Sequence, residues 1–223
     1  MDENPKNEVV RRWSRWSPVA TPTRQWPKIS YNNVIMINPL LRDIPEQIDT
    51  ERLRLRCPHA GDGKVLYDAI YDSQAELERW MPWAQGYVPE AAEQFVREAH
   101  IKFLKRETLP LLIFRTEDNV LLGATGLHDI DWIVPRFEIG YWLSTRYTGS
   151  GYMTEAVVGL TKFCREPLGA HRITIRCDAK NTRSRQVAER AGFALESITA
   201  KDRRGIIDGA LSDTLTFART WPD

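Results

Sequence analysis

The apolar residues of this chain recur at two spacings, which predict helices in one part and strands in another. After Pro89, the residues Ala92, Phe95, Val96 and Ala99 fall on one face of a helical period, as in an amphipathic helix that begins at the proline. From residue 111 onward, short apolar runs bounded by turn residues are typical of strands. The pattern predicts strands at residues 51–56, 111–115, 120–127, 136–144, 171–178, 193–199 and 211–219. It predicts helices at 62–70, 89–103, 151–165 and 183–191, and a further helical stretch that includes residues 77–80.

The order of these elements indicates the fold class. One strand precedes the first helices, and three strands, a helix, a strand, a helix and two strands follow. Such an order predicts an α/β or α+β domain that is layered around one mixed sheet.

The segment that links the strand at 136–144 to the next helix contains two glycines, Gly149 and Gly151. Glycine lets the backbone turn its N–H groups inward, and a helix N-terminus adds partial positive charge, so this loop can bind a pyrophosphate. It is not a nucleotide-triphosphate loop, because no Gly-Lys-Ser/Thr follows, and it lacks the third glycine of a dinucleotide fingerprint.

Specific motifs then show a resemblance to a known family. Arg146, Gly149 and Gly151 match Arg/Gln-x-x-Gly-x-Gly/Ala, the acetyl-CoA motif of the GNAT superfamily of N-acetyltransferases. Residues 137–143, 181–184 and 191–193 fit further family features in the required order. Residues 50–56 and 77–83 resemble the RimJ/RimL branch, whose named members acetylate N-termini of ribosomal proteins. The resemblance covers residues 48–220.

The resemblance implies a GNAT fold, with a mixed and mostly antiparallel central sheet that is splayed between strands 4 and 5 and flanked by helices. Acetyl-CoA would be the cosubstrate, with its pantetheine between the splayed strands. The coenzyme-binding residues that it implies are Leu143, Arg146, Tyr147, Thr148, Gly149, Ser150, Gly151, Tyr152, Met153, Asn181 and Ser184.

The catalytic groups depart from the usual family pattern. Many members carry a tyrosine that protonates the leaving thiolate, and at its position this chain has Ala188. The RimL-like pattern offers the Ser184 hydroxyl instead, and Asn181 would bind pantetheine or acceptor, whereas both residues could also simply support the start of a helix. Glu138 is the candidate base for the acceptor ammonium, against the alternative of an ion-paired strand residue. Asp202 and Asp208 are further carboxylates that could order a water.

The resemblance implies a primary amine as acceptor, and we expect Trp80, Trp83 and His128 to bound its groove, although tryptophans also fill cores. Three alternatives stay open. The acceptor could be a protein N-terminal α-amine or a small-molecule amine such as an antibiotic or an amino-acid derivative. The chain could also be a catalytically weak acyl-CoA-binding module with a tail that contacts nucleic acid. A homodimer would suit the branch.

The composition does not identify the acceptor, but it argues against several other kinds of partner. The chain has 223 residues, 42% hydrophobic and 27% charged, with a net charge of +1, as in a globular protein without a general affinity for polyanions, so nucleic acid is a poor partner. Its three cysteines match neither a zinc spacing nor a disulfide framework, which predicts reduced thiols, no metal and a cytoplasmic location. No apolar run reaches the roughly 18 residues of a membrane span.

The first residues differ from the rest of the chain. We expect residues 1–47 to form an extension, largely disordered up to about residue 35, ahead of a GNAT domain at 48–223, because prolines and tryptophans there follow no period. The extension could reflect a start codon upstream of Met36. Alternatively, Arg11, Arg12 and Arg15 with Trp13 and Trp16 could form a basic aromatic tail that touches RNA or an anionic membrane surface.

Overall fold

The computed structural model describes residues 29–31, 34–36, 38–205 and 208–222. The chain divides into two compact units, residues 1–37 and residues 38–223. In the first unit, strand β1 (Ile29–Tyr31) pairs antiparallel with β2 (Val34–Met36). The basic aromatic tail suggested by the sequence lies outside the described residues.

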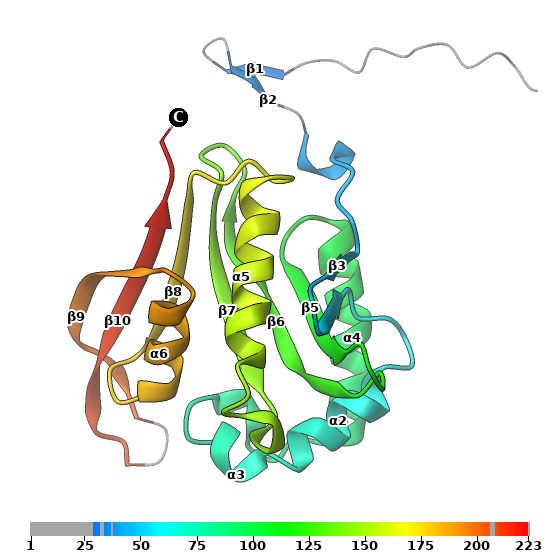
Figure 1. Cartoon of the computed structure of the whole chain (residues 1–223), viewed down its shortest axis with the longest axis vertical. Coiled ribbons are helices and arrows are strands. Elements are labelled where there is room, and N and C mark those ends of the chain that lie inside the picture. Colours follow the sequence, from blue (N-terminus) through cyan, green and yellow to red (C-terminus); the bar gives the residue numbers. More distant parts are fainter. Residues whose placement is uncertain (1–28, 32–33, 37, 206–207, 223) are drawn as a thin grey trace, which may run out of the picture. The chain divides into compact units, whose positions relative to one another are not determined.

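The second unit is built on an eight-stranded sheet in the order β3-β4-β5-β6-β7-β8-β10-β9 (Figure 1). Strands β7 and β8 run parallel, and the other neighbouring pairs are antiparallel. The strands are β3 (Gln47–Asp49), β4 (Leu53–Arg56), β5 (Leu109–Arg115), β6 (Leu121–Asp131), β7 (Arg136–Leu143), β8 (Arg172–Asp178), β9 (Ala194–Arg204) and β10 (Leu211–Thr220).

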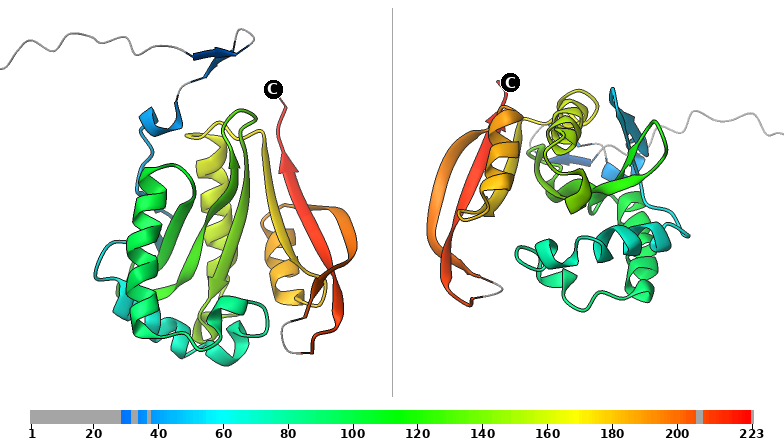
Figure 2. Two further views of the ribbon diagram at one scale, coloured as in Figure 1. Left: turned by 180° about the vertical axis from the view of Figure 1, so that it is seen from behind. Right: turned by 60° about the horizontal axis from the view of Figure 1, so that its bottom comes forward.

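Helices cover both faces of the sheet, as the first two figures show (Figures 1 and 2). On one face, α2 (Gly63–Tyr71), α3 (Gln74–Leu77) and α4 (Pro89–Leu104) bury Leu66, Leu77 and Val96 against the sheet. On the other face, α5 (Tyr152–Arg165) and α6 (Thr182–Arg190) bury Val157 and Ala188 in the larger core. The short 3-10 turns are η1 (Pro39–Leu41), η2 (Pro82–Ala84) and η3 (Thr145–Tyr147).

The parallel strands β7 and β8 separate soon after they begin. Their paired positions end at Glu138 and Thr174, although both strands continue for several residues. The right-hand view of Figure 2 shows β8, β9, β10 and α6 standing apart from the β5–β7 part of the sheet. Beyond the last pair, the facing edges of both strands have no strand partner within the described chain, so their backbone N–H and C=O groups are available to a ligand.

The elements that the apolar pattern predicts are all present, with ends that differ by a few residues. The pattern did not predict β3, and the compact unit begins at Asn38, about ten residues before the start that the sequence suggests. Ile44 is buried in the core, and the Arg42 guanidinium donates to the Leu168 carbonyl at 3.0 Å. Single long-range contacts of this kind leave no periodic signal in the sequence.

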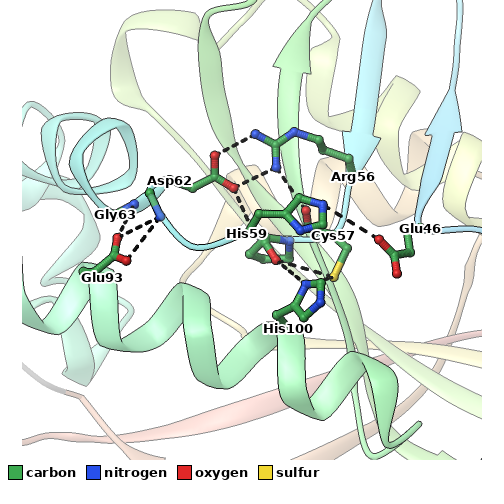
Figure 3. Close-up of polar contacts among 10 residues, drawn as sticks. Glu46, Arg56, Cys57, His59, Asp62, Gly63, Glu93 and His100 are labelled. Carbon is green, nitrogen blue, oxygen red and sulfur yellow. Dashed lines mark hydrogen bonds and ion pairs between the residues drawn. The ribbon is translucent and has the colours of Figure 1, made fainter. Parts of the chain in front are cut away.

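Side chains from β4 and α4 bind the start of α2 (Figure 3). Arg56 forms two hydrogen bonds of 2.7 Å to the Asp62 carboxylate, immediately before α2. Glu93 on α4 accepts the backbone N–H groups of Gly61 and Gly63 at 3.2 Å. A side chain at Gly63 would collide with Glu93, so glycine is required by the close approach of the two helices.

The three cysteines are free and buried. The Cys57 thiol lies 3.7 Å from His100 Nδ1 in the same corner of the molecule (Figure 3). Burial raises the pKa of Cys57 to about 12, and it also raises the pKa values of Cys164 and Cys177. Neutral thiols are therefore expected at all three positions, and Cys57 and Cys164 pack as small apolar side chains.

Candidate active site

A cavity of about 570 Å³ occupies the place where β7 and β8 part. One wall is residues 139–143 of β7, and the opposite wall is residues 175–178 of β8. The start of α5 with the loop before it, one side of α6, and α3 with the turn after it also line the cavity, as do His128 and Arg203. The volume is that of a typical ligand pocket, and an unpaired backbone edge is exposed within it.

The glycine loop, which immediately precedes α5 in the chain, lines part of this cavity. Gly149 and Gly151 have φ values of +82° and +80°, in the left-handed region that only glycine adopts without strain. Gly151 precedes the first turn of α5, so the N–H groups of that turn face outward from the helix N-terminus. A Cβ at Gly149 would meet no atom within 4 Å, which means that open space lies beside the loop backbone. The loop therefore fits the pyrophosphate cradle that the sequence predicts.

The predicted coenzyme residues do not all reach the cavity. Those that line it are Leu143, Thr148, Gly149, Gly151, Tyr152, Met153, Asn181 and Ser184. Arg146, Tyr147 and Ser150 are not among the lining residues of the described chain. Tyr147 packs against the core, where the guanidinium groups of Arg115 and Arg146 lie 5.5 and 5.9 Å from its ring.

A carboxylate at the start of α5 holds the loop in place. Glu155 accepts hydrogen bonds from the Thr50 hydroxyl at 2.6 Å, from the Arg52 backbone N–H at 2.8 Å and from the Arg52 guanidinium at 2.7 Å. Arg52 also donates to the Ser150 carbonyl at 3.2 Å and lies 4.5 Å above the Tyr152 ring. The sequence indicated a strand and a family resemblance for this segment, and the structure shows that Thr50 and Arg52 connect it to the start of α5.

Replacing Glu155 by glutamine should lower the free energy of unfolding by about 1–3 kcal/mol, because Thr50 and Arg52 lose a charged acceptor. Burial raises the pKa of Glu155, but the hydrogen bonds from Thr50 and Arg52 outweigh it and hold that pKa below the usual value. The stabilisation is thus complete above the usual glutamate pKa and is lost as the pH falls through the lowered one. Urea unfolding at a series of pH values measures it.

The matched control is Glu117→Gln, which changes an exposed carboxylate in the β5–β6 turn. If Glu155→Gln kept the acid dependence of the wild-type protein in full, the contacts of Glu155 would not contribute to it.

Ser184 lies at the first turn of α6, inside the cavity. Asn181 caps this helix by accepting the Ser184 backbone N–H at 3.1 Å, so its amide supports the helix start. The Tyr141 hydroxyl donates to the Ser184 carbonyl at 3.0 Å and lies 3.1 Å from Ser184 Oγ. Burial raises the pKa of Tyr141, which keeps its phenol protonated. Tyr141 on β7 therefore places a phenol hydroxyl beside α6, the helix on which Ala188 replaces the tyrosine of many family members.

The sequence missed Tyr141, although the residue stands within the motif at 137–143. Its place on the strand is visible in the sequence, but its partner follows 43 residues later. Cys177, on β8, also lines the cavity. Burial raises the pKa of Cys177, while a hydrogen bond with Ser184 and the charge of Arg203 act in the opposite direction.

The carboxylates take places that differ from those expected. Glu138 is not among the lining residues of the described chain, its side chain is 15% exposed, and Oε1 lies 3.9 Å from His128 Nε2. Asp202 pairs with Arg176 at 3.3 Å. Asp178, at the end of β8, is buried and lines the cavity.

One oxygen of Asp178, Oδ1, accepts the Lys180 backbone N–H at 2.8 Å and the Ser212 hydroxyl at 2.7 Å. These bonds orient the carboxylate and leave Oδ2 without a hydrogen bond in the described part of the chain. Asp178 is therefore a second candidate, besides Glu138, to take a proton in the cavity. The sequence offered no signal for it beyond its position at a strand end.

Two of the three residues expected at the acceptor groove line the cavity, namely Trp80 and His128. Trp80 donates its indole N–H to Glu76 at 3.4 Å, and Glu76 pairs with Arg183 of α6 at 3.1 Å, so α3 and α6 meet at the rim. Trp83 is not among the lining residues of the described chain. Its ring packs edge-on against Trp142, with the ring centroids 6.2 Å apart.

Among the described residues, no helix combines the length and apolar character of a membrane span. In the same residues, His, Cys, Asp and Glu side chains form no group of three that could hold a metal ion.

Comparison with known proteins agrees with this geometry. Residues 52–194 match a family model described as an acetyltransferase (GNAT) domain. The putative ribosomal N-acetyltransferase YdaF of Bacillus subtilis (strain 168) is 31% identical over 158 residues, covering 68% of this chain and 82% of that protein. The ribosomal-protein-serine acetyltransferase of Escherichia coli (strain K12) is 26% identical over 170 residues, covering 76% and 93%.

Among solved structures, the ribosomal L7/L12 α-N-protein acetyltransferase RimL in complex with coenzyme A has a TM-score of 0.73. It is 24% identical in sequence, and the match covers 78% of this chain and 98% of RimL. This likeness shows that the two chains share a fold.

Proposed function

Because this chain belongs to the GNAT acetyltransferase family, we propose that it transfers the acetyl group of acetyl-CoA to the α-amine at the N-terminus of a protein. The family and the acetyl donor follow from the domain match and from the relatives. The acceptor is the proposal, and its main support is that two of the relatives are named as a putative ribosomal N-acetyltransferase and a ribosomal-protein-serine acetyltransferase.

The cavity supplies what the donor requires. The N–H groups of the loop at 148–151 and of the first turn of α5 bind the pyrophosphate, and the edge of β7 at residues 139–143 binds the pantetheine through its backbone. The thioester then lies near Ser184 and Cys177. The RimL structure is described as carrying a disulfide between coenzyme A and a cysteine, which supports a cysteine such as Cys177 at the thiol end.

The reaction joins the amine nitrogen to the thioester carbonyl carbon and breaks the bond from that carbon to sulfur. Asp178 takes the proton of the acceptor ammonium, directly or through water, in place of the predicted Glu138. Ser184 gives its hydroxyl proton to the departing thiolate and takes up the second proton that the nitrogen loses as the amide forms, so that its hydroxyl is restored. Tyr141 orients that hydroxyl from 3.1 Å away. The products are an amide and coenzyme A.

An acceptor screen by thiol release tests the proposal. A short peptide with a free N-terminal serine should be acetylated with a kcat/KM at least about tenfold above that of small amines such as aminoglycosides, because only a peptide also fills the acceptor groove. The same peptide with a blocked N-terminus is the control, and it should release no thiol.

Two outcomes would contradict the acceptor class. Faster turnover of small amines would favour the small-molecule alternative. Saturable acetyl-CoA binding without thiol release from any amine would favour a binding module.

A further inference from the structure

A second cavity of about 380 Å³ adjoins the main one, on the side of the β9–β10 hairpin. The two cavities share three lining residues, Trp80, Asp178 and Arg203. The carboxylate proposed as the base therefore stands at the junction. An acceptor whose amine reaches Asp178 can extend its remaining atoms into the second cavity.

The second cavity is strongly basic for a chain whose net charge is +1. Four basic and two acidic side chains line it, namely Arg79, Lys180, Arg203, Arg204, Asp178 and Asp208. One acidic group, Asp208, is paired with Lys180 at 3.4 Å, and the other, Asp178, is buried at the inner end. Arg79 is paired with Glu76 at 3.5 Å, so the excess of positive charge in the outer part of the cavity is carried by Arg203 and Arg204.

Two arginines of the β9–β10 hairpin, Arg203 and Arg204, line the second cavity. The Arg204 guanidinium donates to the Gly209 carbonyl at 2.7 Å, which ties its side chain across the hairpin. Arg203 stands opposite Ser212 of β10, and Ser212 in turn donates to Asp178. Strand pairing thus places Arg203 next to the serine that binds Asp178, and both Arg203 and Asp178 line the two cavities.

This order of charges, one carboxylate inside and several cations outside, is complementary to an acceptor that carries an ammonium at its end and negative charge just behind it. We propose that the second cavity binds the residues that follow the acceptor amine, and that Arg203 and Arg204 select N-termini with acidic side chains in the first few positions. The inference rests on the proposed function, because it deepens the acceptor class. Polyamines and aminoglycosides carry further positive charges and would be repelled.

The experiment compares peptides of equal length that start with serine. In one, the next three residues are Asp or Glu, and in the other they are the corresponding amides. The wild-type chain should show a kcat/KM ratio of about five to ten in favour of the acidic peptide, as expected for a few half-exposed ion pairs. The ratio should fall with added salt. Calorimetry with coenzyme A in place of acetyl-CoA should give the same preference in binding, without turnover.

Arg203→Gln and Arg204→Gln should each bring the ratio toward one, and Lys180→Gln offers a third variant should either arginine variant fail to fold. The matched control is Arg97→Ala on α4, an exposed arginine outside both cavities, which should keep the wild-type ratio.

A wild-type ratio near one, in rate and in binding, would overturn the inference while leaving N-terminal acetylation intact. Failure of the proposed function is recognised separately with two small acceptors, a free amino acid and the same amino acid with its carboxylate converted to an amide. The two differ only in the negative charge behind the amine. If no peptide is acetylated but the amino acid exceeds its amide in an Arg203-dependent way, the acceptor class is wrong and the anion selection stands. If the amino acid and its amide are equal as well, both proposals fail.

Discussion

Replacing Gly149 and Gly151 together by valine should weaken acetyl-CoA binding by at least about a hundredfold, the largest effect that we expect from any change outside the core. Both residues have φ values near +80°, where a β-branched side chain costs roughly 1–3 kcal/mol at each site. Beyond that strain, the valine side chain at position 149 would fill the open space beside the loop that we assign to the phosphate, and the one at 151 would approach the Arg52 guanidinium. Equilibrium dialysis or calorimetry with acetyl-CoA measures the loss.

The control separates strain from blocked binding. Gly169 has a φ of +71°, a Cβ there would meet no atom within 4 Å, and it is outside the lining of the cavity. Gly169→Val should therefore lower stability but leave acetyl-CoA affinity unchanged. A folded double variant at 149 and 151 with wild-type affinity would refute the placement of the coenzyme.

Removing the Ser184 hydroxyl should reduce kcat by about a hundredfold, the lower end of what a positioned general acid contributes. The KM for acetyl-CoA should stay within about twofold, because the loop and the β7 edge supply most of the binding. Tyr141→Phe should give a smaller loss of kcat, since Ser184 keeps its hydroxyl but loses the phenol that lies 3.1 Å from it. Steady-state kinetics with a saturating acceptor, measured across the alkaline pH range, distinguishes these changes.

Ser197→Ala, on an exposed part of β9, is the matched control for the loss of a hydroxyl and should not affect kcat. If Ser184→Ala is folded and its kcat lies within threefold of wild type, about 0.7 kcal/mol, then Ser184 is not the proton donor. A loss of thermal stability with unchanged kcat would instead assign Ser184 a role in the start of α6.

The carboxylates illustrate where sequence reasoning was insufficient. Glu138 was selected because it stands on the strand before the glycine loop, yet it occupies the last position at which β7 pairs with β8, just before the residues that line the cavity. Asp178 looked like an ordinary strand end. It gained its place only because β8 separates from β7 after Thr174 and opens a cavity at its far end.

The sequence by itself determined the family, the order of the elements and the position of the glycine loop before α5. These features are local, because left-handed glycines, a helix N-terminus and the apolar periods of strands and helices are each specified by residues close together in the chain. The tertiary structure alone decided which groups meet. Tyr141 and Ser184 are 43 residues apart, and Thr50 and Glu155 are 105 apart. Such pairings depend on how the sheet twists and parts, and no local pattern encodes them.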